Sequence, residues 1–250
     1  MKRTILFTAL LGLLWLFTGA QDTPGAEDIL EKIDENMVFD TAYVEAEMRI
    51  TIRNRLITKT FTSFSQGNEK SFLEFLSPAR DRGTKILKIE EIVQIYYPSA
   101  ERILRLSGHL LRQSMMGSDF SYEDMTERSK KLREEYRAEV KGREEIDGRP
   151  CWVMELVSRL PKQTYFTRKV WVDSERYLGL REELYAKSGK LLKVMTVDEI
   201  KTTRNRFYPV KVTLEDKLRE NSRTEMIITR IDFDVPVPEG TFSERNLMRK

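Results

Sequence analysis

The chain has 250 residues, 43 of them basic and 40 acidic, which gives a formal net charge of +3 at pH 7. The two signs are interspersed along every segment, a pattern typical of a solvated surface that argues against nucleic-acid binding. With one cysteine, Cys151, and one histidine, an internal disulfide and a zinc site of histidine and cysteine are excluded. Cys151 stands in the apolar run Cys-Trp-Val-Met, so we expect a buried thiol, with an intermolecular bridge as the alternative.

The first residues have the pattern of a secretory signal peptide. Lys2 and Arg3 precede an apolar run at 5–17, which ends in small residues at 18–20. This run of about thirteen residues is shorter than the roughly twenty that cross a bilayer, which favours cleavage after Ala20 over an uncleaved anchor. No cysteine follows the run to carry a lipid. We therefore expect residues 1–20 to be a signal peptide and residues 21–250 to form one exported domain.

After the leader, the sequence predicts one helix and then strands. Residues 27–38 carry apolar side chains at three-to-four-residue spacing, which predicts a short amphipathic helix. From Tyr43 to Arg53 the spacing becomes two, so one face of a long strand is buried and the other is wet. Similar segments predict further strands at 56–65, 69–76, 84–90, 92–97, 101–106, 134–146, 150–158, 164–173, 177–186, 190–201, 206–218 and 222–234.

Short turns connect many of these strands. Asp147-Gly148, Ser188-Gly189 and Asn221 supply residues that tolerate the positive φ of tight hairpins. Consecutive hairpins imply an antiparallel meander, and a sheet of about eleven or twelve strands curls more easily than it stays flat. We therefore expect a mainly β fold, a half-open, incomplete antiparallel barrel. No glycine-rich or proline-rich linker divides the chain.

Residues 107–128 interrupt the strand pattern. The segment gathers apolar side chains, among them Leu110, Leu111, Met115, Met116 and Phe120, into a short space. Two short helices, or a helix and a loop, would present these side chains over an open end of the curled sheet as a lid. The alternative, a plug that only completes the core, is equally compatible with the residues.

The residues do not form a catalytic constellation. His109 is the only histidine, and no Gly-x-Ser-x-Gly elbow or glycine-rich phosphate loop is present. Adjacent acidic pairs such as Glu182-Glu183 point to opposite faces of a strand, and Asp232 and Asp234 lie where a strand is expected to end. We therefore expect no enzyme activity, no catalytic residue, no metal site and no cofactor.

Several segments carry a family pattern. The most specific are Ile-Tyr-Tyr-Pro-Ser at 95–99, Arg-Ile-Leu-Arg-Leu at 102–106 and Met-Gly-Ser-Asp-Phe-Ser-Tyr-Glu-Asp-Met at 116–125. Weaker support comes from 169–173, 207–209 and 238–242. In an exported, cysteine-poor chain with a helix followed by a meander, these segments resemble the outer-membrane lipoprotein-sorting family, the LolA-like periplasmic carriers. The resemblance covers nearly the whole chain after the leader.

The resemblance implies a fold of about eleven antiparallel strands covered by helices, with an apolar interior for acyl chains. It implies a periplasmic, monomeric carrier that takes acylated lipoprotein or lipid from the inner to the outer membrane. Its partners would be an inner-membrane transporter of the ABC or resistance-nodulation-division (RND) type and an outer-membrane acceptor. In the classical carrier an arginine locks the lid, and Arg49, Arg80, Arg82 and Arg105 are the possible counterparts here.

On this reading, the cavity is lined by Met48, Ile50, Phe61, Phe75, Leu104 and Leu106 and covered by Leu110, Leu111, Met115, Met116 and Phe120. The alternative is a solid-cored, non-enzymatic interaction module, or an accessory protein of an inner-membrane exporter, that binds its partner through strand edges and residues 107–128.

Overall fold

The structure is a computed structural model that describes residues 24–37, 39–126, 129–203 and 206–249. The predicted signal peptide at 1–20 lies outside the described residues. Within the described ranges, no helix has the length and apolar character required to cross a membrane.

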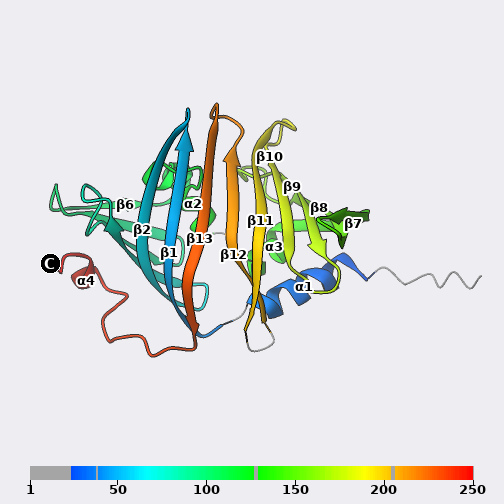
Figure 1. Cartoon of the computed structure of the whole chain (residues 1–250). Helices are drawn as coiled ribbons and strands as arrows, with labels where there is room; N and C mark the ends of the chain where they lie inside the picture. Colours follow the sequence, from blue (N-terminus) through cyan, green and yellow to red (C-terminus); the bar gives the residue numbers. More distant parts are fainter. Residues whose placement is uncertain (1–23, 38, 127–128, 204–205, 250) are drawn as a thin grey trace, which may run out of the picture.

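One antiparallel sheet of 13 strands forms the body of the protein (Figure 1), in the order β6-β5-β4-β3-β2-β1-β13-β12-β11-β10-β9-β8-β7. The strands are β1 Thr41–Ile52, β2 Arg55–Gln66, β3 Lys70–Ser77, β4 Lys85–Ile89, β5 Ile92–Tyr97, β6 Arg102–Leu106, β7 Tyr136–Ile146, β8 Arg149–Ser158, β9 Thr167–Asp173, β10 Gly179–Tyr185, β11 Leu191–Thr203, β12 Arg206–Asp216 and β13 Ser222–Phe233. Pairing stops at β6 and β7, so the sheet stays open. This confirms the incomplete antiparallel barrel. The thirteen strand segments predicted along the chain match the observed number, whereas the count of about eleven implied by the resemblance is too low.

Strands β1 and β13 join the two halves of the sheet. They pair from Ala42 opposite Phe233 to Ile52 opposite Ser222. Each half is otherwise a run of neighbouring hairpins, as the short turns predict. The last strand therefore pairs with the first, and the chain builds outward from this centre to both open edges.

Helices cover part of the sheet. The predicted N-terminal helix is α1, Ala26–Met37, and the 107–128 segment contains two 3₁₀ helices, η1 Gly108–Arg112 and η2 Met115–Gly117, followed by α2 Tyr122–Thr126. Two helices were not predicted: α3, Ser129–Glu135, and α4, Glu244–Leu247. Because α3 runs to Glu135, the strand predicted from residue 134 begins only at Tyr136.

The strand alternation divides apolar side chains between the two faces of the sheet. On one face, residues 107–126, which we call the lid segment, pack over β1–β6, and α1 packs over β7–β9. On the other face, Leu247 of α4 covers Phe72 and Leu87, and a small cluster surrounds Cys151 and Trp171. The face that carries α1, α2 and α3 therefore holds the larger interior.

The buried thiol predicted at Cys151 is confirmed, since the residue is 1% exposed. Burial, aided by the charge of Asp173, raises the pKa of this thiol to about 11. Because the thiolate is the reactive form, the native protein should not react with a thiol-reactive disulfide reagent at about pH 8, whereas protein unfolded in urea should react fully. Rapid labelling of the native protein, measured by the absorbance of the released thiolate, would contradict this burial.

Candidate functional site

A cavity of about 370 Å³ lies between the sheet and its helices, on the half of the sheet formed by β8–β12. Most of its lining is aliphatic. The lining residues are Leu30, Ile33, Asn68, Phe120, Asp124, Leu132, Met154, Leu156, Arg168, Val170, Val172, Leu178, Gly179, Arg181, Glu182, Leu184, Met195, Val197, Pro209, Val212 and Leu214.

The period-two pattern of the strands explains this apolar wall. Met154 and Leu156 on β8, like Met195 and Val197 on β11, are two residues apart and therefore point to the same face. The cavity-facing side of α1 supplies Leu30 and Ile33, which are three residues apart and share one helix face. A sheet wall and a helix wall thus enclose an apolar space.

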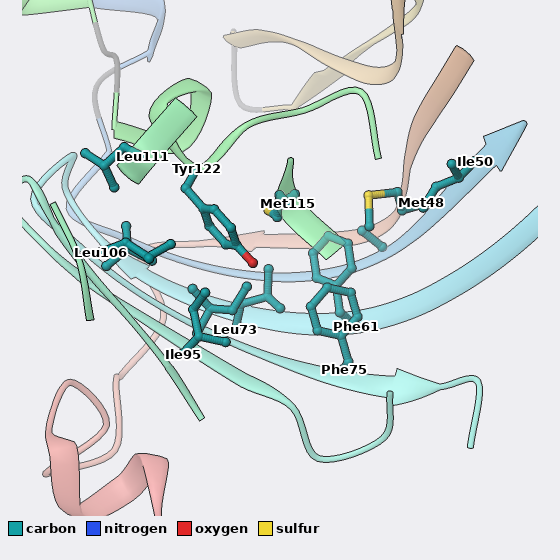
Figure 2. Packing of buried hydrophobic residues seen from close by; sticks show 13 residues of the cluster. Met48, Ile50, Phe61, Leu73, Phe75, Ile95, Leu106, Leu111, Met115 and Tyr122 are labelled. Atoms are coloured by element: carbon teal, nitrogen blue, oxygen red, sulfur yellow. The ribbon is translucent and has the colours of Figure 1, made fainter. Parts of the chain in front are cut away.

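Most of the predicted cavity residues lie elsewhere, in a packed core cluster over β1–β6. Figure 2 shows seven of them together in this cluster: Met48, Ile50, Phe61, Phe75, Leu106, Leu111 and Met115. Leu110, Met116 and Phe120 pack against the cluster while remaining partly exposed. Among the predicted residues, Phe120 is the one that also lines the cavity. The sequence pattern grouped these residues correctly but did not distinguish a filled interior from a hollow one.

Leu104 does not join this cluster, because its side chain is 45% exposed. It lies opposite Ile95 and shares the inner face with Leu106, but β6 is the last strand of the sheet. Leu104 therefore lies at the open edge of the sheet and is not among the residues that line the cavity over β8–β12.

The described part of the 107–128 segment has features of both the plug and the lid that the sequence allows. Leu111, Met115 and Tyr122 are buried in the core cluster, which is the behaviour of a plug. Phe120 and Asp124 line the cavity, which is the behaviour of a cover. The described part of the segment therefore bridges the filled half of the interior and the hollow half.

A buried carboxylate fixes this segment to β13. Asp119 is 2% exposed, and its carboxylate accepts hydrogen bonds from the hydroxyls of Ser222 and Thr224, the latter at 2.6 Å. The Asp119 backbone N–H donates to Thr224 Oγ1 at 2.9 Å. Arg219 Nη1 donates to the Ser118 carbonyl at 2.7 Å and lies 3.6 Å from Asp119. Arg219 is thus an arginine that bonds to the lid segment, whereas the candidate Arg49 pairs with Glu47.

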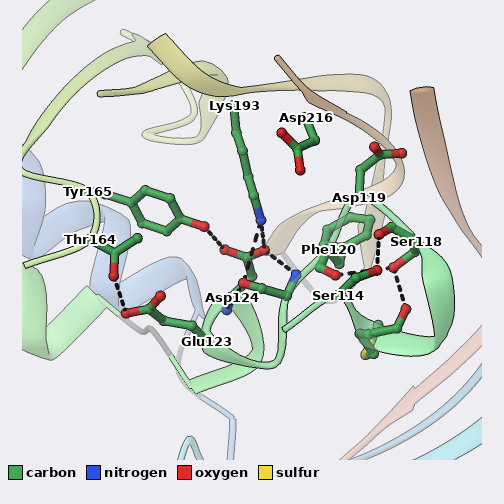
Figure 3. Close-up of polar contacts among 12 residues, drawn as sticks. Ser114, Ser118, Asp119, Phe120, Glu123, Asp124, Thr164, Tyr165, Lys193 and Asp216 are labelled. Atoms are coloured by element: carbon green, nitrogen blue, oxygen red, sulfur yellow. Dashed lines mark hydrogen bonds and ion pairs between the residues drawn. The ribbon is translucent and has the colours of Figure 1, made fainter. Parts of the chain in front are cut away.

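Asp124 forms a second polar centre, beside the cavity (Figure 3). Its carboxylate accepts from Lys193 Nζ, Tyr165 Oη and the Ser121 N–H, each at 2.6 Å. Ser121 Oγ in turn accepts from the Asp124 N–H at 3.3 Å, which completes a capping box at the start of α2. Burial, with the nearby Asp124 charge, raises the pKa of the Tyr165 hydroxyl, so this group stays protonated and donates.

The charged groups that line the cavity are paired with opposite charges. Arg168 Nη1 lies 2.9 Å from Glu182 Oε1, and both side chains are largely buried. Arg181 Nη2 lies 2.7 Å from Glu183 Oε1, and Asp124 is paired with Lys193. The cavity therefore presents apolar walls and neutralised charges, an environment suited to an apolar ligand.

The described residues contain no group of three or more histidine, cysteine or acidic side chains arranged to hold a metal ion. His109 lies on η1 and is exposed. The residues that do line the cavity were visible in the sequence as alternating apolar positions on the strands predicted at 150–158, 164–173, 190–201 and 206–218. The pattern did not indicate how closely α1 and the lid segment approach these strand residues.

A protein-family model described as “Uncharacterized protein” matches residues 67–249, more than half of the chain. The comparison with curated proteins found no match. Among solved structures, a DUF1329 family protein from Desulfovibrio piger is 25% identical with a TM-score of 0.83, and the match covers 90% of this chain and 100% of that chain.

Two further structures bear on the fold. A domain from Vibrio parahaemolyticus assigned to outer membrane lipoprotein sorting is 23% identical with a TM-score of 0.79, and a LolA superfamily protein from Nitrosomonas europaea is 24% identical with a TM-score of 0.73. Each match covers 90% of this chain and 100% of the other. The chain therefore belongs to the family that the matching model describes, and its fold is that of the LolA-like outer-membrane lipoprotein-sorting proteins.

Proposed function

We propose that this protein is a carrier that shelters the acyl chains of a lipoprotein or lipid in the cavity over β8–β12. The observation that carries the proposal is the cavity itself: its volume of about 370 Å³ falls within the roughly 300–1,000 Å³ of typical ligand pockets. Its walls are mostly aliphatic and its charged groups are paired, so an acyl chain would meet no uncompensated charge.

The free energy of exposing an acyl chain to water explains why a carrier needs such a cavity. Burial of each methylene group is worth about 0.8 kcal/mol, so an acyl chain of about fifteen methylenes costs about 12 kcal/mol to expose to water. A carrier that crosses an aqueous compartment must supply an equivalent apolar environment, and release then needs a partner or a receiving membrane.

The remaining parts of the proposal follow from the LolA-like fold. The carrier is exported to the periplasm by a signal peptide cleaved after Ala20, and it works as a monomer. It receives its cargo from an inner-membrane transporter of the ABC or RND type and delivers it to an outer-membrane acceptor. Support comes from the fold shared with the lipoprotein-sorting structures and from the leader pattern of residues 1–20.

The test fills the cavity with a side chain of the protein. Met195 lines the cavity, so Met195→Trp should lower the affinity for a fluorescent fatty acid by about tenfold or more, because the indole occupies the space of several methylenes. The measurement is a fluorescence titration of each purified variant, with urea unfolding to check that both remain folded.

Thr196→Trp is the matched control, because Thr196 is the next residue of β11 and its side chain points to the opposite face. Its affinity should equal that of the unchanged protein. Equal affinity of Met195→Trp and the unchanged protein would refute binding in this cavity, and so would a failure of the unchanged protein to bind the probe.

A further inference from the structure

Three hairpin turns lie side by side along one edge of the sheet. They are the connections β1–β2 at 53–54, β12–β13 at 217–221 and β10–β11 at 186–190, which Figure 1 shows together at the top of the sheet. The Arg53 N–H donates to the Asn221 carbonyl at 3.1 Å, and the Lys217 N–H donates to the Leu192 carbonyl at 2.8 Å. These bonds join the three turns into one continuous edge, which we call the hairpin edge.

The hairpin edge is basic. The charged side chains in its three turns are Arg53, Lys187, Lys190, Lys217, Arg219 and one acid, Glu220. Arg219 is engaged with Asp119 and Lys217 with Glu215, whereas Arg53, Lys187 and Lys190 lie exposed.

The β8–β9 connection continues the basic edge. The Phe166 N–H donates to the Tyr185 carbonyl at 2.8 Å, which places this connection beside the β10–β11 turn. It adds two exposed basic residues, Arg159 and Lys162. The basic turns therefore lie along the edge of the sheet from β2, through β1 and β13, to β8, in the order in which these strands pair.

The described turns at the opposite edge of the sheet have the opposite charge. The described turns there, at 67–69, 90–91, 147–148 and 174–178, carry the acids Glu69, Glu90, Glu91, Asp147 and Glu175. Their one basic residue, Arg176, is paired with Asp173. Among the described turns, positive and negative charges are therefore separated along the strand direction, although the net charge of the whole chain is only +3.

Large apolar side chains are exposed on the basic edge as well. Leu56 is 60% exposed, Leu218 is 55% exposed and Leu160 is 44% exposed. Each lies in a turn or within two residues of one. Leucines at hairpin tips beside lysine and arginine provide two attractions to an anionic bilayer: insertion of apolar side chains at the interface and Coulomb attraction to phosphates.

We propose that the hairpin edge docks on a bilayer that contains anionic phospholipids, with Leu56, Leu160 and Leu218 entering the interface and the neighbouring lysines and arginines facing phosphates. The separation of charge orients the protein, because the acidic edge is repelled by the same surface. The hairpin that carries Leu218 also holds Ser118 and Asp119 of the lid segment, so docking places that segment near the bilayer. The proposal does not depend on a ligand in the cavity.

The test is cosedimentation of the purified protein with phosphatidylcholine vesicles that contain about one quarter phosphatidylglycerol, and with vesicles of phosphatidylcholine alone. Binding should be at least about tenfold tighter to the anionic vesicles and should weaken as salt is added. Leu56→Asp with Leu218→Asp, and separately Lys187→Glu with Lys190→Glu, should each weaken the anionic binding by about tenfold or more.

Matched controls separate the edge from the overall charge. Lys32→Glu with Lys141→Glu changes the net charge by the same amount at exposed sites away from the edge, and Met248→Asp adds an acid at another exposed apolar residue. These controls should bind like the unchanged protein. Any contribution from residues 1–23 is common to all variants.

Absence of binding to anionic vesicles would overturn the proposal, and the edge would then have to serve a protein partner. Equal losses in the edge variants and the controls would also overturn it, since they would show attraction by net charge alone. Failure of the fatty-acid titration would leave these results unaffected, so this proposal and the carrier proposal can fail separately.

Discussion

Replacement of Asp119 by alanine should lower the free energy of unfolding by about 3–5 kcal/mol, as expected when one partner of a buried, charged hydrogen-bond network is removed. The carboxylate is buried and accepts from two hydroxyls of β13, and Arg219 approaches it from the adjacent turn. Its loss leaves buried donors without an acceptor and frees the lid segment from the sheet. Urea unfolding monitored by tryptophan fluorescence measures the change.

Two further variants serve as controls for the stability of Asp119→Ala. Asp119→Asn keeps the size and one acceptor oxygen, so its loss should be smaller than that of Asp119→Ala. Glu220→Ala, in the same hairpin region but exposed, should change the stability by less than about 0.5 kcal/mol. A loss below about 1 kcal/mol for Asp119→Ala would show that the network does not hold the segment.

Replacement of Phe75 by alanine should cost about 3–5 kcal/mol, because a fully buried aromatic side chain leaves a cavity in a packed interior. Phe75 is 0% exposed, and its ring centroid lies 5.6 Å from that of Phe61. Phe75 does not line the cavity over β8–β12. The molecules that remain folded should therefore bind a fluorescent fatty acid with unchanged affinity.

Leu76→Ala is the control, since Leu76 is the next residue of β3 and is 44% exposed. It should change neither stability nor binding appreciably. If Phe75→Ala kept its stability and lost the fatty acid instead, the ligand would lie among the residues that the sequence pattern pointed to, and our placement of the site would be wrong.

The strands could be predicted because their side chains alternate between two environments. Each predicted strand segment overlaps one observed strand, and most boundaries differ by no more than two residues. The short helices α3 and α4 could not be predicted in the same way. They have 7 and 4 residues, too few for the apolar spacing of a helix to repeat.

The candidate site was harder to predict than the fold. The alternation assigns Met48, Ile50 and Phe75 to a buried face, and all three are buried. The alternation does not indicate whether the side chains that face the sheet fill the space above it. Met115 fills the space above β1–β6, whereas α1 leaves a cavity above β8–β12. The hydrogen bonds of Asp119 could not be predicted from local sequence, because the partner Thr224 is 105 residues away in the chain.

Native mass spectrometry of the protein purified from its own host tests the central claim most directly. We expect a complex with one acyl-bearing lipid or lipoprotein per protein molecule, present for the unchanged protein and Thr196→Trp and strongly reduced for Met195→Trp. A ligand-free protein that also fails to take up a fatty acid in solution would contradict the carrier proposal, and retention of the ligand by Met195→Trp would contradict its place in the cavity.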